Sequence, residues 1–243
     1  MNNLDNNEDY KLWDSKLHDG LVVYDNKEYK IFDTIFPFHN DFFMMTIMIE
    51  LLNNADFFVE TGTYIGDTSG FVALNFNNLK VFTCEIIEES YNKALKKLNK
   101  LSNVTAVLEK SPDALYNLEN YYNKDIYNNN VVFWIDAHWG ELPLNKEIDY
   151  ITKNFNNYCI FIDDFQNPYD SGFTNDGDDF NINIIKNFIH NKENVKVYFP
   201  SYPSNHIKCS FRNIHDVPIP PRGYCIITNQ NLKNYDSLKL FPI

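Results

Sequence analysis

The sequence has 243 residues, of which 44% are hydrophobic and 22% charged, and its formal net charge at pH 7 is −12. This length and composition are typical of one soluble α/β domain with a full core. The negative charge disfavours phosphate backbones and anionic lipids, so we expect neither nucleic acid nor a membrane as a partner.

The N-terminus and the cysteines point to the cytoplasm. Met1–Asp9 is polar and acidic, unlike a signal peptide, and no apolar run approaches the roughly 20 residues of a membrane helix. None of the 4 cysteines belongs to a C-x-x-C pair. We therefore expect free thiols in a reducing compartment.

From residue 40 onward, apolar runs alternate with amphipathic segments. This alternation predicts βα units around a parallel sheet. A mostly buried helix is expected over 40–53, another helix up to about Asn191, and a closing strand pair at 195–199 and 224–228. The parallel strands are expected at Ala55–Glu60, Lys80–Glu85, Asn103–Leu108, Val131–Asp136 and Tyr158–Asp163.

Carboxylates stand at the ends of four of these five strands. They are Glu60, Glu85, Asp136 and the pair Asp163-Asp164, while the third strand runs on towards Ser111. A single carboxylate there could simply cap the following helix. Because ligands of open α/β sheets bind at the carboxyl ends of the strands, a row of them indicates a shared pocket.

The loop after the first strand contains Gly62 and Gly66 in a G-x-x-x-G spacing, with Glu60 two positions before the first glycine. A dinucleotide-binding loop has the spacing G-x-G-x-x-G and must accept a pyrophosphate, which a carboxylate would repel. Glu60 would instead attract an ammonium group. Glu85, 25 positions further on (85 − 60), suits the hydroxyls of a ribose. A ligand with ribose, ammonium and no phosphate is S-adenosylmethionine, which we favour over NAD.

The segment from Val59 to Ser69 resembles motif I of class I S-adenosylmethionine-dependent methyltransferases, and Cys84-Glu85 resembles their second acidic motif. The resemblance extends over residues 57–228 and implies a Rossmann-like, seven-stranded sheet with helices on both faces and an antiparallel last strand. It divides the chain into an N-terminal segment with a helix (1–54) and the cofactor-binding domain (55–243). It assigns to the cofactor Glu60, Gly62, Thr63, Gly66, Thr68, Ser69, Glu85, Ser111, Asp136 and Trp139.

The second half of the chain resembles the catechol-type and bacterial sugar O-methyltransferases, through the segments 133–139 and 161–165. This resemblance implies methylation of a small-molecule or sugar hydroxyl. It also implies Mg²⁺ held by Asp136, Asp163 and Asp164, of which Asp164 replaces the amide found in catechol-type enzymes. Three hard oxygen ligands suit Mg²⁺, which would lower the pKa of a bound hydroxyl.

The chain departs from the catechol-type pattern at the base. Those enzymes carry a lysine just after the tryptophan, whereas Gly140 and Glu141 follow Trp139 here. His138 is the nearest candidate base, because imidazole accepts a proton near neutral pH. It could instead contact the adenine. A metal-independent methyltransferase with His138 or Asp163 as the base is the alternative mechanism.

Other features are given simpler interpretations. His39 is expected as a surface residue beside a helix, with a place lining the cleft from above as the alternative. The polar segment 169–179 is expected as a lid or substrate loop, and Arg222 as part of a proline-rich crossover. Two rival functions remain, a non-catalytic methyltransferase-like binding module and an NAD-dependent enzyme. Association into a homo-oligomer is left open.

Overall fold

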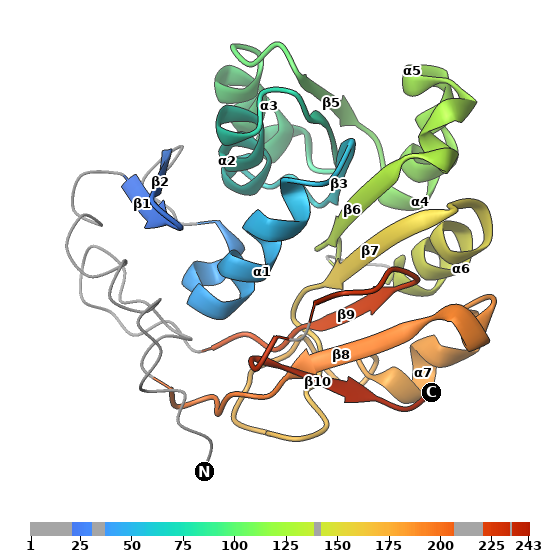
Figure 1. Cartoon of the computed structure of the whole chain (residues 1–243). Coiled ribbons are helices and arrows are strands. Elements are labelled where there is room, and N and C mark those ends of the chain that lie inside the picture. Colours follow the sequence, from blue (N-terminus) through green and yellow to red (C-terminus); the bar gives the residue numbers. More distant parts are fainter. Residues whose placement is uncertain (1–20, 31–36, 139–141, 207–220, 234) are drawn as a thin grey trace.

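The computed structural model describes residues 21–30, 37–138, 142–206, 221–233 and 235–243 (Figure 1). An α/β sheet with helices on both faces forms its centre. The helices are α1 (Phe42–Leu52), α2 (Asp67–Asn75), α3 (Glu88–Leu98), α4 (Ser111–Tyr116), α5 (Leu118–Tyr122), α6 (Leu144–Asn154) and α7 (Ile182–Ile185). Short 3₁₀ turns are η4 (Phe38–Asn40), η5 (Lys124–Asn128), η6 (Lys186–Phe188) and η7 (Lys192–Asn194). None of the described helices is both long and apolar enough to span a bilayer.

The main sheet has eight strands in the order β10-β8-β9-β7-β6-β3-β4-β5. They are β3 (Phe57–Thr61), β4 (Lys80–Glu85), β5 (Val104–Leu108), β6 (Asn130–Ile135), β7 (Asn157–Ile162), β8 (Lys196–Pro200), β9 (Cys225–Thr228) and β10 (Leu238–Phe241). The five strands β3 to β7 pair in parallel, and β9 pairs antiparallel with both β7 and β8. The predicted parallel core and antiparallel last strand are therefore confirmed.

The expected strand count of seven is wrong by one, because β10 adds to the edge of β8. Leu238 lies opposite Pro200 and Phe241 opposite Val197 in an antiparallel ladder. β10 has only four residues. A run this short carries little periodic signal in the sequence, so its strand state depends on an available edge partner.

Two layers of helices bury the sheet. Side chains of β6 alternate between them: Val132 and Trp134 join the core beneath α1 and α2, whereas Val131, Phe133 and Ile135 join the core beneath α4, α6 and α7. Figure 1 shows α1, α2 and α3 on one face of the sheet and α4, α6 and α7 on the other. The apolar run from Val131 to Ile135, buried at every position, fits this double burial.

One local prediction from the sequence is corrected, and one element was not predicted at all. The helix expected up to Asn191 is only the four residues of α7, followed by η6. Asparagine, phenylalanine and isoleucine after Lys186 have low helix propensity, and Asn191 is left-handed with φ 51°. The hairpin of β1 (Leu21–Tyr24) and β2 (Lys27–Lys30) was not expected. Its turn residues both have positive φ, as a type I′ turn requires.

The carboxyl ends of β3, β4, β6 and β7 lie next to one another, because these strands are parallel neighbours in the sheet. Each of these strands is followed by a turn or loop rather than directly by its helix. The residues just after the four strands therefore meet at one edge of the sheet.

Candidate active site at the carboxyl edge of the sheet

The glycine loop after β3 lies directly against the end of β6. Gly62 has φ +87°, and a Cβ built there would stand 2.5 Å from the carbonyl oxygen of Asp136. The Asp136 amide in turn donates to the carbonyl oxygen of Thr61 at 3.0 Å. Both the positive φ and the backbone contact require glycine. Gly66, with φ +83°, starts α2 and packs against Ala94 and Leu98 of α3.

Glu60 lies inside the protein beneath this loop. Its side chain is buried, and its Oε2 accepts hydrogen bonds from the hydroxyls of Ser69 and, at 2.7 Å, Thr83. Burial raises the pKa of Glu60 to about 7, and the hydroxyl donors oppose that rise. Glu60 thus holds together β3, β4 and the first turn of α2. Thr63, also buried, extends this network through the Thr83 hydroxyl.

Glu85 ends β4 and holds the rim of the loop. Its Oε2 accepts from the Tyr64 amide and its Oε1 from the Ile87 amide, each at 2.8 Å. Tyr64 is left-handed, with φ 48°, and its side chain is 64% exposed. Each carboxylate oxygen can accept more than one hydrogen bond, so Glu85 retains acceptor capacity for ligand hydroxyls.

Ser111 opens α4 and turns inward. Its hydroxyl donates to Oε1 of Glu147, a fully buried residue of α6. Burial raises the pKa of Glu147 to about 7, and the hydroxyls of Ser111 and Thr61 oppose that rise. Thr68 is half-buried in the first turn of α2. Trp139 lies outside the described residues.

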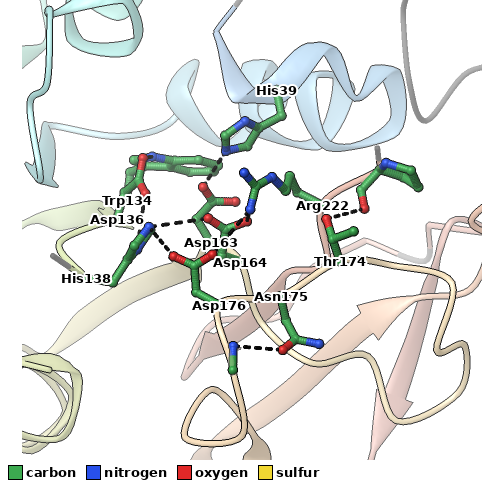
Figure 2. A network of polar contacts seen from close by, with 12 residues as sticks. His39, Trp134, Asp136, His138, Asp163, Asp164, Thr174, Asn175, Asp176 and Arg222 are labelled. Atoms are coloured by element: carbon green, nitrogen blue, oxygen red, sulfur yellow. Dashed lines mark hydrogen bonds and ion pairs between the residues drawn. The ribbon is translucent and has the colours of Figure 1, made fainter. Parts of the chain in front are cut away.

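The carboxylates after β6 and β7 converge with two histidines and an arginine (Figure 2). Within the described residues, two groups place potential metal-ligand atoms within 4.8 Å of one another. One is His39, Asp136 and Asp163, and the other is Asp136, His138 and Asp164. The three carboxylates expected to bind Mg²⁺ are therefore divided between two groups that share Asp136.

Asp163 is fully buried and pairs with His39. Burial alone would raise the pKa of Asp163, but the charge and hydrogen bond of His39 outweigh it and the pKa falls. For His39, burial would lower the pKa, and Asp163 reverses that effect so that the pKa is raised. His39 precedes α1, as expected, but its ring reaches the buried carboxylate of Asp163, which agrees with the alternative place beside the cleft. Its neighbour Phe38 packs edge-on against Trp134, with ring centroids 5.1 Å apart.

Asp164 follows in the chain but faces other partners, because its backbone is left-handed with φ 51°. Its Oδ1 accepts from Arg222 Nη1 at 2.6 Å, and its Oδ2 lies 3.3 Å from His138 Nε2. Burial and the neighbouring charge of Asp163 raise the pKa of Asp164 to about 7. For Asp136, burial and the charges of Asp163 and Asp164 raise the pKa well above its usual value.

His138 belongs to the second of these groups. Its Nε2 is 2.8 Å from Asp176 Oδ2, whereas its Nδ1 lies 3.5 Å from Asp136 Oδ1 and has no hydrogen-bond partner among the described residues. Burial lowers the pKa of His138, and Asp176 only partly reverses this. The imidazole is consequently biased towards its neutral form, with the proton on Nε2 and a lone pair on Nδ1.

Asp176 was not predicted as a site residue from the sequence, although it lies in the segment expected to be a lid or substrate loop. Arg222 and His39 were expected in other roles. All three come from segments between regular elements, where no periodicity indicates which way a side chain points. Their proximity to the strand ends depends on tertiary packing.

Comparison with known proteins supports the fold. The sequence matches no family model and no curated protein. Among solved structures, an O-methyltransferase from Bacillus cereus in complex with S-adenosylhomocysteine aligns over 82% of this chain and 84% of its own, with 16% identity and a TM-score of 0.54. The O-methyltransferase TomG of Streptomyces achromogenes, involved in tomaymycin synthesis and solved with S-adenosylmethionine, aligns over 76% and 78%, with 13% identity and a TM-score of 0.51.

A third structure, a putative O-methyltransferase from Klebsiella pneumoniae, aligns over 76% of this chain and 78% of its own, with 14% identity and a TM-score of 0.51. At these identities the likeness concerns the fold. The chain has the Rossmann-like fold of class I methyltransferases, as the sequence motifs predicted, although its sheet has one strand more than the expected seven.

Proposed function

We propose that the protein is an S-adenosylmethionine-dependent O-methyltransferase acting on a small-molecule or sugar hydroxyl. The observation that carries the proposal is the pairing of the glycine loop with Glu85. Gly62 brings the loop backbone against Asp136, while Glu85 lies beside the loop at the end of the next strand. In a methyltransferase fold this arrangement suits a ligand that has a ribose and no phosphate.

The cofactor would lie across the carboxyl ends of β3 and β4. Glu85 would accept from the ribose hydroxyls, since its backbone bonds leave lone pairs free. Glu60 is enclosed by Ser69 and Thr83, so its contribution would be to shape the loop. Asp136 lies beside the loop, and its side chain is 27% exposed, so the methionine end of the cofactor would reach it.

Methyl transfer would then take place beside His138. The acceptor oxygen attacks the methyl carbon, an O–C bond forms, and the C–S bond breaks to leave a neutral thioether. The hydroxyl proton would go to His138 Nδ1, a buried nitrogen that has no hydrogen-bond partner among the described residues and belongs to a ring that Asp176 orients through Nε2. Holding the oxygen in line with the C–S bond would supply much of the remaining rate.

The Mg²⁺ site that the resemblance implies fits the chain only in part. Asp163 offers a buried carboxylate oxygen without a partner among the described residues, which favours a cation. Asp164, however, is already paired with Arg222. An ion bound here would lower the pKa of the acceptor hydroxyl and orient its oxygen. The roles of Glu85, His138 and Asp176 proposed above do not depend on it.

The test is calorimetric titration of the full chain with S-adenosylmethionine and S-adenosylhomocysteine, with NAD as the comparison ligand. We expect saturable binding of the first two and none of NAD. Absence of binding at millimolar concentrations would exclude the proposal. A screen of sugar and phenolic acceptors, followed by release of S-adenosylhomocysteine, would then identify the acceptor class and separate an enzyme from a binding module.

A further inference from the structure

The carboxylates that follow β6 and β7 form a cluster with two parts, and the division falls between Asp163 and Asp164. The left-handed φ of Asp164 turns the two neighbouring carboxylates towards different partners. Asp163 faces His39, which comes from the segment before α1, whereas Asp164 faces Arg222, which comes from the segment before β9 (Figure 2). The two carboxylates that the family resemblance treats as one ligand pair therefore have separate surroundings.

In the part of the cluster around Asp164, a positive charge and hydrogen-bond donors already contact the carboxylates. Arg222 Nη1 lies 2.6 Å from Asp164 Oδ1 and 3.4 Å from Asp176 Oδ1. The other oxygens of both carboxylates face His138 Nε2, at 3.3 Å and 2.8 Å. Because the guanidinium remains charged at any accessible pH, it offsets the charge of Asp164 and competes with a metal ion for its Oδ1.

In the part of the cluster around Asp163, one carboxylate oxygen has no such partner among the described residues. His39 Nε2 and one oxygen each of Asp136 and Asp163 lie within 4.8 Å of one another. The Asp163 side chain is fully buried, yet its Oδ1 has no hydrogen-bond partner among the described residues. A buried carboxylate oxygen without a donor is strongly unfavourable unless a cation or ligand is bound. The 27% exposure of Asp136 provides the entry path.

An unusual backbone turn at Phe38 and His39 places the His39 ring beside Asp163. Phe38 and His39 both have positive φ, 55° and 52°, which is uncommon for residues with side chains. Phe38 is buried against Trp134 and Phe71, and this packing fixes the unusual turn. Backbone strain of this kind persists only where surrounding contacts maintain it, and it is often found at functional sites.

We propose that His39, Asp136 and Asp163 bind a divalent transition-metal ion, with His39 taking the ligand position that the family resemblance gives to Asp164. The ion would replace the proton shared between His39 and Asp163. A set of one imidazole and two carboxylates suits Mn²⁺, Fe²⁺ or Zn²⁺ better than Mg²⁺, which prefers oxygen ligands alone. The proposal concerns metal binding and is independent of whether the chain transfers methyl groups.

The experiment is a titration of the metal-free full chain with Mn²⁺, in which free ion is measured by electron paramagnetic resonance. We expect one Mn²⁺ to bind per chain, to be displaced readily by Zn²⁺ and poorly by Mg²⁺. His39→Gln should weaken Mn²⁺ binding by about 100-fold or more, since it removes a direct ligand. Asp164→Asn, the matched control, should leave the affinity nearly unchanged, because Arg222 already occupies that carboxylate.

A spectroscopic measurement separates the two histidines. The electron spin-echo of bound Mn²⁺ should carry ¹⁴N modulation from a coordinated imidazole, lost in His39→Gln and retained in His138→Gln. His39→Asn serves as a second variant if the first does not fold, as judged by its thermal unfolding without metal. Three results would overturn the proposal: no Mn²⁺ binding to the wild-type chain, loss of binding in Asp164→Asn alone, or ¹⁴N modulation that survives both His39 variants. Calorimetry with S-adenosylmethionine on the same samples tests the methyltransferase proposal separately.

Discussion

Asp176 Oδ2 lies 2.8 Å from Nε2 of His138, and the opposite ring nitrogen of His138 has no hydrogen-bond partner among the described residues. The acid comes from the long loop after β7 and the histidine from the segment after β6. A carboxylate on one ring nitrogen fixes the tautomer and leaves the other nitrogen available to accept a proton. This relationship makes His138 a stronger candidate base than its place in the sequence alone suggested.

His138→Gln should lower kcat by about 10²- to 10⁴-fold, the usual contribution of a positioned base, without weakening S-adenosylmethionine binding. Asp176→Asn should lower kcat by a smaller factor, because the ring remains but its tautomer is less restricted. Steady-state kinetics with the acceptor found by screening would measure both. Added imidazole should partly restore His138→Ala, and a normal kcat in His138→Gln would reject the role.

Glu85→Ala should weaken S-adenosylmethionine binding by about 10- to 100-fold, since hydrogen bonds to a charged group contribute about 1.5–3 kcal/mol. Glu85→Gln should have an intermediate effect. Calorimetry gives the affinities, and Glu88→Ala, at an exposed position in the first turn of α3, is the control. Equal affinities for wild type and Glu85→Ala would mean that the ribose lies elsewhere.

Gly62→Ala should destabilise the fold and abolish cofactor binding. An added Cβ would stand 2.5 Å from the Asp136 carbonyl oxygen, and the backbone φ of +87° is itself unfavourable for alanine. We expect a loss of at least about 3 kcal/mol in the free energy of unfolding. Gly177→Ala is the matched control, because Gly177 also has positive φ, +118°, but its Cβ would meet nothing within 4 Å. That change should cost about 1 kcal/mol. Equal losses would show that the contact with Asp136 is unimportant.

Glu147→Gln should make the protein relatively more stable at alkaline pH. Burial raises the pKa of Glu147 from 4.5 to about 7, so the folded state holds a proton that the unfolded state has lost between these pH values. The contribution of Glu147 to stability is therefore fully present below about pH 4.5 and declines as the pH rises through 7. A neutral amide removes this decline, which amounts to about 1.4 kcal/mol for each unit of pKa shift.

Urea unfolding of wild type and Glu147→Gln at pH 5 and pH 8 would measure the effect. The stability of the variant relative to wild type should be higher at pH 8 by about 2–3 kcal/mol. Asn145→Gln, an uncharged change on the same helix, should give the same difference at both pH values. A difference for Glu147→Gln that does not change with pH would contradict the proposed protonation.

The strand ends were predictable because parallel strands have two strong signals, apolar runs and a polar residue at the carboxyl end. Val131–Asp136 was expected as a strand ending in a carboxylate, and β6 covers Asn130–Ile135 with Asp136 immediately after it. The same holds for Glu85 and Asp163. Parallel pairing then brings such residues to one edge, whatever the details of the helices.

Side-chain partnerships were not predictable in the same way. Asp163 and Asp164 are adjacent in the sequence, and only the left-handed backbone of Asp164 directs them to His39 and Arg222. These partners lie 124 and 58 positions away. No spacing rule links a loop residue to a strand end at such separations, because the contact depends on how the intervening elements pack.

The added strand β10 also determines where a group fused after Ile243 would lie. Since β8 runs parallel to β7, the antiparallel register of β10 carries the chain from Leu238 near the carboxyl edge to Phe241 beside Val197, away from it. A surface anchor or reporter fused after Ile243 would therefore sit at the end of the sheet opposite the glycine loop (Figure 1). Immobilised in this way, the protein would present the carboxyl edge of its sheet to solution.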